Sequence, residues 1–212
     1  MISIASSIKR AIAMAAATAA MLSIAACGQT TANSQPNQTT SDSADSGKIS
    51  VVASINQWGS VAKDLGGDYV DVTNIMTNTN VEAHDYEPTS QDVAQFSKAD
   101  VAVVNGADYD PWASKAAKST KATLVNAAET NGIKEGDNPH VWFSSKVRNA
   151  TADAITDAYV KAQPANKAKF EDLNKAWHEK SDELESKIKD ASTKLSGLPY
   201  AATESVAWYL AD

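Results

Sequence analysis

The chain has 212 residues, and its 26 acidic against 19 basic side chains give a formal net charge of −7. A negative charge without a basic cluster argues against nucleic-acid binding, which depends on Lys and Arg contacts with phosphates. Cys27 is the only cysteine, so a disulfide bond within the chain is excluded.

Residues 1–26 have the pattern of a secretory signal. Lys9 and Arg10 precede an apolar, alanine-rich run that is too short and too weakly flanked for a good spanning helix. The run ends in Ile-Ala-Ala-Cys-Gly at 24–28, which looks like a bacterial lipobox. We expect cleavage before Cys27 and lipid on its thiol, although Cys27 as a passive residue of the run is the alternative. Lipidation would anchor the mature protein to the outer face of a bacterial membrane.

The segment after Cys27 is polar up to residue 47, with one proline and no large apolar side chain. Such a segment cannot bury enough surface to offset the entropy of ordering it. Residues 27–47 are therefore expected to be a lipidated cysteine and a flexible tether.

From residue 48 onward, strand and helix patterns alternate. Expected strands are 49–53, 69–76, 101–105 and 122–126, and expected helices are 56–65, 89 or 90 to 98, and 111–118. The nearly all-apolar run at 101–105 is typical of a strand covered on both faces. In the second helix, Val93 and Phe96 are expected to face the core. The alternation predicts an α/β fold with a parallel sheet, which binds ligands at the carboxyl ends of its strands.

After residue 143 the pattern becomes helical. Residues 144–161 predict one helix, and 165–195 predict a second of roughly 45 Å. The large apolar residues of the second helix fall on one stripe, namely Phe170, Leu173, Trp177, Leu184, Ile188 and Leu195. Its wet side carries three Glu–Lys pairs four residues apart, at 171/175, 183/187 and 185/189, and a solvated His178. The helix is either a solvated coiled-coil-like element or a rigid beam between two lobes. Residues 198–203 then predict a strand.

Two of the three histidines lie in short, polar, proline-marked segments between expected elements. His84 begins His-Asp-Tyr-Glu-Pro-Thr, and His140 lies in Asn-Pro-His-Val-Trp. A histidine in such a place is a metal ligand, an acid–base group or an ordinary surface residue. Asp85 and Glu87 are further candidate ligands, with loop support or solvent exposure as the alternative.

Several segments together resemble a known family. They are Leu-Gly-Gly-Asp at 65–68, residues 83–89, Val-Val-Asn-Gly at 103–106, residues 138–142 and Ala-Thr-Glu-Ser at 202–205. Their order and spacing are similar to the metal-binding lipoproteins of bacterial ABC importers. These are the zinc and manganese solute-binding proteins, some of them also described as surface adhesins.

The resemblance implies a two-lobe α/β solute-binding architecture with a long rigid linking helix. On this basis, residues 48–163 are the N-terminal lobe, 164–195 the linking helix and 196–212 the start of the C-terminal lobe. The second lobe is then largely missing from this chain.

The resemblance also implies one divalent ion, Mn²⁺ or Zn²⁺, held as cargo by four side chains. Carried over by position, the ligands are His84, His140 and Glu204, and the fourth lies past Asp212, so we expect a fragment or a truncated protein. Many zinc members have histidine at the third position, whereas glutamate resembles the manganese type. The absence of a histidine-rich loop also favours manganese, while intrinsic affinity favours zinc.

The predicted function is capture of Mn²⁺ or Zn²⁺ outside the cytoplasm, without catalysis, by a monomer that delivers the ion to an ABC permease. One alternative is a lipoprotein adhesin with a structural metal. The other is a metal-dependent hydrolase with Asp85 as its base, although the chain has no HExxH or GxSxG pattern.

Overall fold

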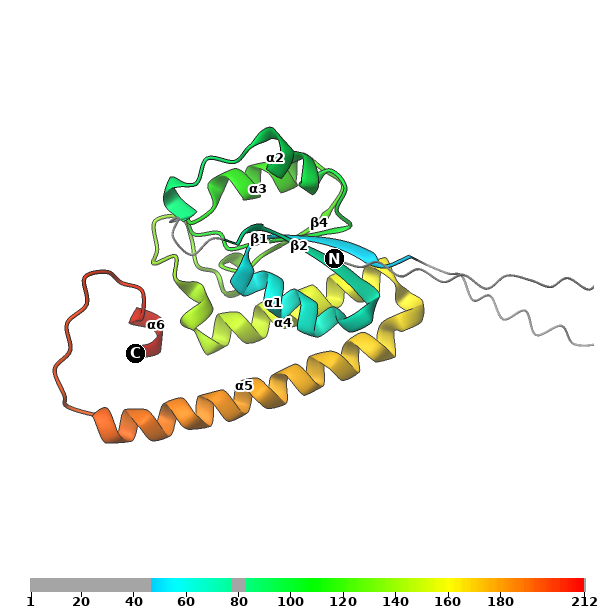
Figure 1. Cartoon of the computed structure of the whole chain (residues 1–212). Helices are drawn as coiled ribbons and strands as arrows, with labels where there is room; N and C mark the ends of the chain where they lie inside the picture. Colours follow the sequence, from blue (N-terminus) through cyan, green and yellow to red (C-terminus); the bar gives the residue numbers. More distant parts are fainter. Residues whose placement is uncertain (1–46, 78–82, 212) are drawn as a thin grey trace, which may run out of the picture. The chain divides into compact units, whose positions relative to one another are not determined.

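The computed structural model describes residues 47–77 and 83–211. Its sheet has the strand order β2-β1-β3-β4, and every pairing is parallel (Figure 1). The strands are β1 (Ile49–Ile55), β2 (Val70–Met76), β3 (Val101–Val104) and β4 (Thr123–Asn126). The prediction of an α/β fold with a parallel sheet is confirmed. The expected signal, Cys27 and nearly all of the tether lie outside the described residues.

Helices cover both faces of the sheet. They are α1 (Asn56–Gly66), α2 (Ser90–Phe96), α3 (Pro111–Lys118), α4 (Ser145–Ala162), α5 (Lys167–Leu195) and α6 (Trp208–Ala211). Short 3-10 turns complete the chain at η1 (Gly67–Tyr69), η2 (Ala83–Asp85), η3 (Glu129–Asn131), η4 (Val141–Phe143) and η5 (Pro164–Asn166). Figure 1 shows α2 and α3 on one face of the sheet and α1 and α4 on the other.

Alternating strand side chains divide the core into two layers. Val51 and Val103 pack towards α1 and α4, whereas Val52 and Val104 pack towards α2 and α3. This division follows from the two-residue period of a strand, and it explains why β3 is apolar throughout.

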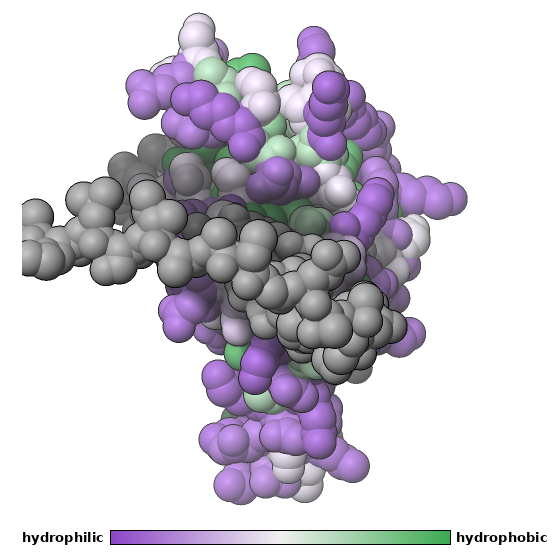
Figure 2. Space-filling view, turned by 90° about the vertical axis from the view of Figure 1, so that its right-hand side faces the viewer, coloured by the Kyte–Doolittle hydropathy of each residue, from purple (hydrophilic) through white to green (hydrophobic). Residues whose placement is uncertain are grey.

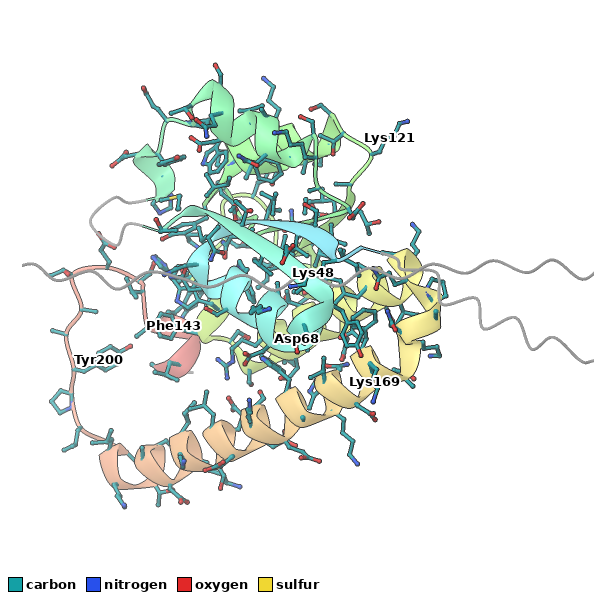
Figure 3. All side chains as sticks on the ribbon, turned by 45° about the vertical axis from the view of Figure 1, so that its right-hand side comes forward. Lys48, Asp68, Lys121, Phe143, Lys169 and Tyr200 are labelled. Carbon is teal, nitrogen blue, oxygen red and sulfur yellow. The ribbon has the colours of Figure 1, made fainter. Side chains whose placement is uncertain are left out.

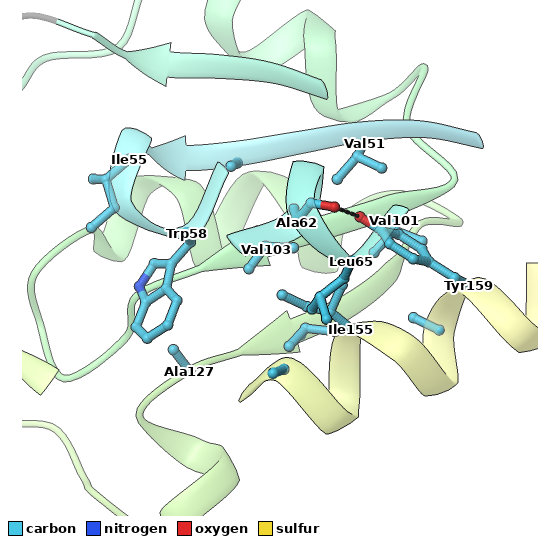
Figure 4. Packing of buried hydrophobic residues seen from close by; sticks show 14 of the residues in the cluster. Val51, Ile55, Trp58, Ala62, Leu65, Val101, Val103, Ala127, Ile155 and Tyr159 are labelled. Carbon is cyan, nitrogen blue, oxygen red and sulfur yellow. Dashed lines mark hydrogen bonds between the residues drawn. The ribbon is translucent and has the colours of Figure 1, made fainter. Parts of the chain in front are cut away.

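The larger layer holds α1 and α4 against the sheet (Figure 4). Trp58, Leu65 and Tyr159 are fully buried there. The Tyr159 hydroxyl donates a 2.9 Å hydrogen bond to the backbone oxygen of Ala62, so α4 is joined to α1 by a polar contact inside an apolar layer. Burial raises the pKa of the Tyr159 hydroxyl well above its usual range, which keeps it a donor.

Helix α5 packs on the rest of the chain mainly through its first half. Phe170 is fully buried, whereas Leu184 and Leu195 are 45% and 59% exposed. The distal half of the predicted apolar stripe is therefore largely uncovered in the described residues. In Figure 2 the lower part of the molecule, which α5 forms, is dominated by hydrophilic side chains.

The polar contacts of α5 differ partly from the prediction. The Glu183–Lys187 pair forms at 2.6 Å, but Glu185 pairs with Arg148 of α4 at 2.7 Å instead of Lys189, and Glu171 pairs with Lys167. A partner on α4 replaces the local one because Arg148 is held in place by hydrogen bonds to the backbone oxygens of Trp142 and Phe143 in η4.

The prediction that His178 is solvated is wrong. Its ring is half-buried, and Nε2 lies 2.7 Å from Oδ1 of Asp153 on α4. Asn174 also donates to the same carboxylate oxygen, at 2.9 Å. Because α5 packs along α4, this side of the helix is an inter-helix contact rather than a solvent face.

Two further predictions are wrong. Residues 198–203 form irregular chain with a bend at Thr203 instead of a strand, and Tyr200 in this segment (Figure 3) is 71% exposed. A strand needs a neighbour for its backbone groups, and none of the described strands pairs with this segment. Val93 is 42% exposed because the short helix α2 fully buries only Phe96.

In the part of the chain that the structure describes, no helix has both the length and the apolar character needed to cross a membrane.

Gly66 permits the close approach of α1 to β2. A Cβ atom at Gly66 would lie 2.3, 2.4 and 2.9 Å from Cγ1, Cγ2 and Cβ of Val70. Its φ of −99° suits any residue, so the constraint is steric alone. We expect Gly66→Ala to lower the free energy of unfolding by about 1–3 kcal/mol, because β-branched Val70 cannot rotate all three atoms away.

Urea unfolding measures this effect, with Gly47→Ala as the matched control. A Cβ at Gly47 would meet nothing within 4 Å. Equal unfolding midpoints for the two variants would show that the approach of α1 to β2 tolerates a methyl group.

Candidate metal centre

The two candidate histidines lie in loops at one end of the sheet. His84 is in η2, which follows β2, and His140 directly precedes η4. A third loop, 105–110, follows β3 and carries Tyr109. Because all four strands are parallel, loops that follow them meet at the carboxyl edge, where such sheets bind ligands.

The ring of Tyr109 lies against the rings of both histidines. Its ring centroid lies 4.7 Å from that of His84 and 5.9 Å from that of His140, edge-on in both cases. Tyr109 and His140 are 8% and 6% exposed, whereas His84 is open to solvent. One imidazole is thus fixed in the protein while the other remains accessible to solvent.

Asn138 orients the ring of His140. Its Oδ1 lies 2.8 Å from the ring Nδ1 and also accepts the backbone N–H of His140 at 3.0 Å. An amide oxygen only accepts, so in the neutral ring the proton is on Nδ1 and the lone pair is on Nε2. That tautomer can bind a metal ion through Nε2, and an oriented second nitrogen is typical of metal-binding histidines.

Trp142 and Arg148 support the same loop. The centroid of the Trp142 ring lies 5.4 Å from that of the His140 ring and 5.2 Å from that of the Tyr109 ring. Arg148 Nη1 donates to the backbone oxygens of Trp142 and Phe143, at 3.1 and 3.0 Å. Its Nη2 donates to Glu185, so the turn after His140 is tied to the long helix α5.

Asn105 connects the loop to the core. Its Oδ1 accepts a 2.9 Å hydrogen bond from Nε1 of Trp58, and its Nδ2 donates to the backbone oxygen of Pro139 at 2.9 Å. Asn105 and Trp58 are fully buried. The residue immediately before His140 is therefore held by a buried amide rather than by solvent-exposed contacts.

Asp110 shapes the loop that carries Tyr109. Its two carboxylate oxygens accept the backbone N–H groups of Asn105 and Gly106, at 2.7 and 2.9 Å. Gly106, Ala107 and Asp108 all have positive φ, at 78°, 49° and 59°. Two non-glycine residues in this conformation are costly, so the Asp110 bonds are needed to hold the turn.

Burial raises the pKa of the Asp110 carboxyl to about 6, although its backbone hydrogen bonds favour the ionised form. Between about pH 4 and about pH 6 the folded chain keeps a proton that the unfolded chain has released. Protonated Asp110 therefore contributes to stability at low pH, and this contribution is lost as pH rises through about 6. The loss lowers the free energy of unfolding by roughly 3 kcal/mol.

Urea unfolding of the original chain and of Asp110→Asn, at pH 4 and pH 7, tests this expectation. The variant carries no titratable group there, so the stability difference between the two chains should shift in favour of the variant as pH rises. A difference that is the same at both pH values would contradict it.

Glu204, the third candidate ligand, is exposed in the bend before α6. The next residue, Ser205, accepts a 2.8 Å hydrogen bond through its backbone oxygen from Nδ2 of Asn138. Glu204 thus lies one residue from a contact with the His140 loop. Within 47–77 and 83–211, however, no three His, Cys, Asp or Glu side chains come close enough together to hold a metal ion.

The neighbours of His84 have other environments. Asp85 and Glu87 are exposed. The Tyr86 hydroxyl donates to Asp92 Oδ2 at 2.8 Å, and Asp92 forms a capping box with Thr89 at the start of α2. The loop after His84 is thus fixed by a helix cap.

Sequence reasoning gave no role to Tyr109, Asn138 or Asp110. A local signal existed for one of them, since Pro111 at the first turn of α3 marks Asp110 as the preceding cap position. The contacts of Tyr109 with the two histidines, and that of Asn138 with Ser205, join segments far apart in the sequence, and no local pattern encodes them. The contact of Asn138 with His140 spans only two residues.

Comparison with known proteins identifies the family of this chain. The family model described as ZnuA, zinc-uptake complex component A, periplasmic, matches residues 51–212. The chain belongs to this family. The prediction of a metal-binding transport family rather than an enzyme family is therefore confirmed.

Individual relatives of the ZnuA family differ in the metal they are named for. The high-affinity zinc uptake system protein ZnuA of Bacillus subtilis is 29% identical over 216 residues, which cover 91% of this chain and 65% of the relative. The manganese ABC transporter substrate-binding lipoprotein scaA of Streptococcus gordonii is 28% identical over 195 residues, covering 84% and 61%.

Solved structures show the same fold. The metal-dependent lipoprotein YcdH from Bacillus subtilis superposes with a TM-score of 0.71 at 30% identity, over 77% of this chain and 63% of that one. The chain thus spans about two thirds or less of these relatives.

Proposed function

We propose that this protein captures a divalent metal ion outside the cytoplasm and passes it to an ABC import permease. His84, His140 and Glu204 are the proposed ligands. The observation that carries the proposal is the convergence of His84 and His140 on Tyr109, with the His140 ring oriented through Nδ1 by Asn138.

The donor set suits first-row divalent ions. Two imidazoles and a carboxylate admit Mn²⁺, Fe²⁺ or Zn²⁺, and intrinsic affinity would favour Zn²⁺ over Mn²⁺. Glutamate at 204 and the lack of a histidine-rich loop support Mn²⁺. Among relatives, the Bacillus protein is named for zinc and the Streptococcus protein for manganese, so family membership supports either ion.

The proposed organisation follows from the family. Residues 48–163 are the N-terminal lobe, 164–195 the linking helix and 196–212 the start of a second lobe. Cys27 carries a lipid that anchors a monomer on the extracytoplasmic face of the membrane. The Streptococcus relative is named as a lipoprotein, which supports the anchor.

Metal content tests the proposed function. The full chain, purified in detergent and stripped with a chelator, is dialysed against equal concentrations of Mn²⁺ and Zn²⁺, and bound metal is measured by mass spectrometry. We expect one ion per chain, and none in a His84→Ala, His140→Ala double variant. Equal metal content in the two proteins would overturn the proposal.

A further inference from the structure

Asn138 uses both ends of its side-chain amide. The oxygen faces His140, taking its backbone N–H and contacting its ring nitrogen Nδ1. The nitrogen donates to the backbone oxygen of Ser205, 67 residues further along the chain. One planar group therefore contacts the ring of one proposed ligand and the residue next to another.

A second contact joins the same two segments. The hydroxyl of Tyr209 donates a 2.8 Å hydrogen bond to the backbone oxygen of Asn138. The Tyr209 ring is half-buried and packs against the larger core layer, and helix α6, which carries it, contacts η4. The segment 205–209 is thus attached to the His140 loop at two points, both on Asn138.

Resting on the proposed function, we propose that Asn138 is a positioning residue that couples the orientation of the His140 ring to the placement of the segment bearing Glu204. The amide is rigid and planar, so its oxygen and nitrogen move together. A displacement of Ser205 that pulls on Nδ2 rotates Oδ1 and with it the ring of His140. Conversely, a ring held by a bound ion fixes Oδ1 and so holds Ser205, and Glu204 beside it, near the site.

Substitutions of Asn138 can remove the contact made by its side-chain nitrogen without removing the one made by its oxygen. Asn138→Asp keeps an acceptor oxygen for His140 but loses the donor to Ser205. Asn138→Ala loses both. Tyr209→Phe removes only the neighbouring hydroxyl contact and leaves the amide in place, which makes it the matched control.

Two readouts need no metal. Nitrogen-15 NMR of the full chain in detergent reports which ring nitrogen of His140 carries the proton, and hydrogen exchange reports the opening of residues 205–211. We expect Asn138→Asp to keep the Nδ1–H form and speed exchange of 205–211, and Asn138→Ala to change both. Tyr209→Phe should change exchange alone. A ring signal and an exchange rate unchanged in Asn138→Ala would overturn the proposal.

A third readout measures the coupling itself, by Co²⁺ titration followed through its visible absorption. We expect Asn138→Ala to weaken Co²⁺ binding by about 10–100-fold, the usual effect of losing a partner that orients a ligand. Glu204→Gln should weaken binding severalfold in the original chain, and by a much smaller factor when combined with Asn138→Asp. The same factor in both backgrounds would show that Asn138 does not place Glu204.

Together, the metal-free and Co²⁺ measurements distinguish failure of the proposed function from failure of the proposed coupling. If the original chain binds no Co²⁺, the proposed function fails, while the metal-free ring and exchange measurements still decide whether Asn138 links the two segments. If Co²⁺ binding depends on His140 but the variants of Asn138 behave like the original chain, the proposed function stands and the coupling is wrong.

Discussion

Replacing His140 with alanine is expected to remove most of the stabilisation of the fold by Mn²⁺ or Zn²⁺. At a free metal concentration about 100 times the dissociation constant, a bound ion stabilises the folded chain by about 2.7 kcal/mol. Loss of a partner that merely orients a ligand costs 10–100-fold in affinity, so loss of the ligand itself should cost at least about 100-fold. At the same metal concentration, about 0.4 kcal/mol of stabilisation then remains.

The third histidine provides the control for this experiment. His178 lies on α5, where its ring contacts Asp153 rather than the loops at the sheet edge. His178→Ala should keep the full metal-dependent rise in melting temperature, and His84→Ala should lose it as His140→Ala does. Full stabilisation of His140→Ala by metal would contradict the assignment of this residue as a ligand.

Asn105→Ala is expected to be among the most destabilising single substitutions in the chain, by about 3 kcal/mol or more. It leaves the Trp58 Nε1–H and the Pro139 backbone oxygen without the partners they have in the native structure. Each buried polar group deprived of its partner costs about 1–3 kcal/mol, and the lost side-chain volume adds a cavity. Because Pro139 precedes His140, metal binding should weaken as well.

Urea unfolding of Asn105→Ala beside Asn131→Ala isolates the effect of burial. Asn131 also donates to a backbone oxygen, that of Lys146 at 2.8 Å, but it lies on the surface. Its removal should change stability by no more than about 0.5 kcal/mol. Similar losses for the two variants would mean that the Asn105 network contributes little to the fold.

The sheet was predictable because each strand has a strong local signal. Val101 to Val104 is apolar at every position, as expected for a strand buried on both faces, and that burial is observed. The starts of two helices were also predictable, because Thr89 caps α2 and Pro111 begins α3. Local chemistry determines such features, so a single sequence contains them.

The errors arose where a distant segment decides the outcome. Residues 198–203 have a strand-like composition, but a strand also requires a paired neighbour. Glu185 has a lysine four residues ahead on its own helix, yet it pairs with Arg148 of α4. In both cases the local sequence pattern favours one structure, and tertiary contacts favour another.

The candidate site was predictable to different degrees. His84 and His140 stand out because histidine is rare here and both lie in proline-marked loops at the sheet edge. Glu204 was nominated through the family resemblance alone. Tyr109, Asn105 and Asn138 each have a contact across 25 or more residues, and no single-sequence pattern reveals such contacts.

X-ray absorption of the zinc-loaded full chain is the sharpest test of a metal centre built on His84 and His140, because it reports the atoms bound to the ion. We expect imidazole nitrogens at about 2.0–2.1 Å from the zinc ion, with scattering from two rings in the original chain and from one ring in His84→Ala or His140→Ala. A zinc spectrum with no imidazole contribution in the original chain would contradict a metal centre built on His84 and His140.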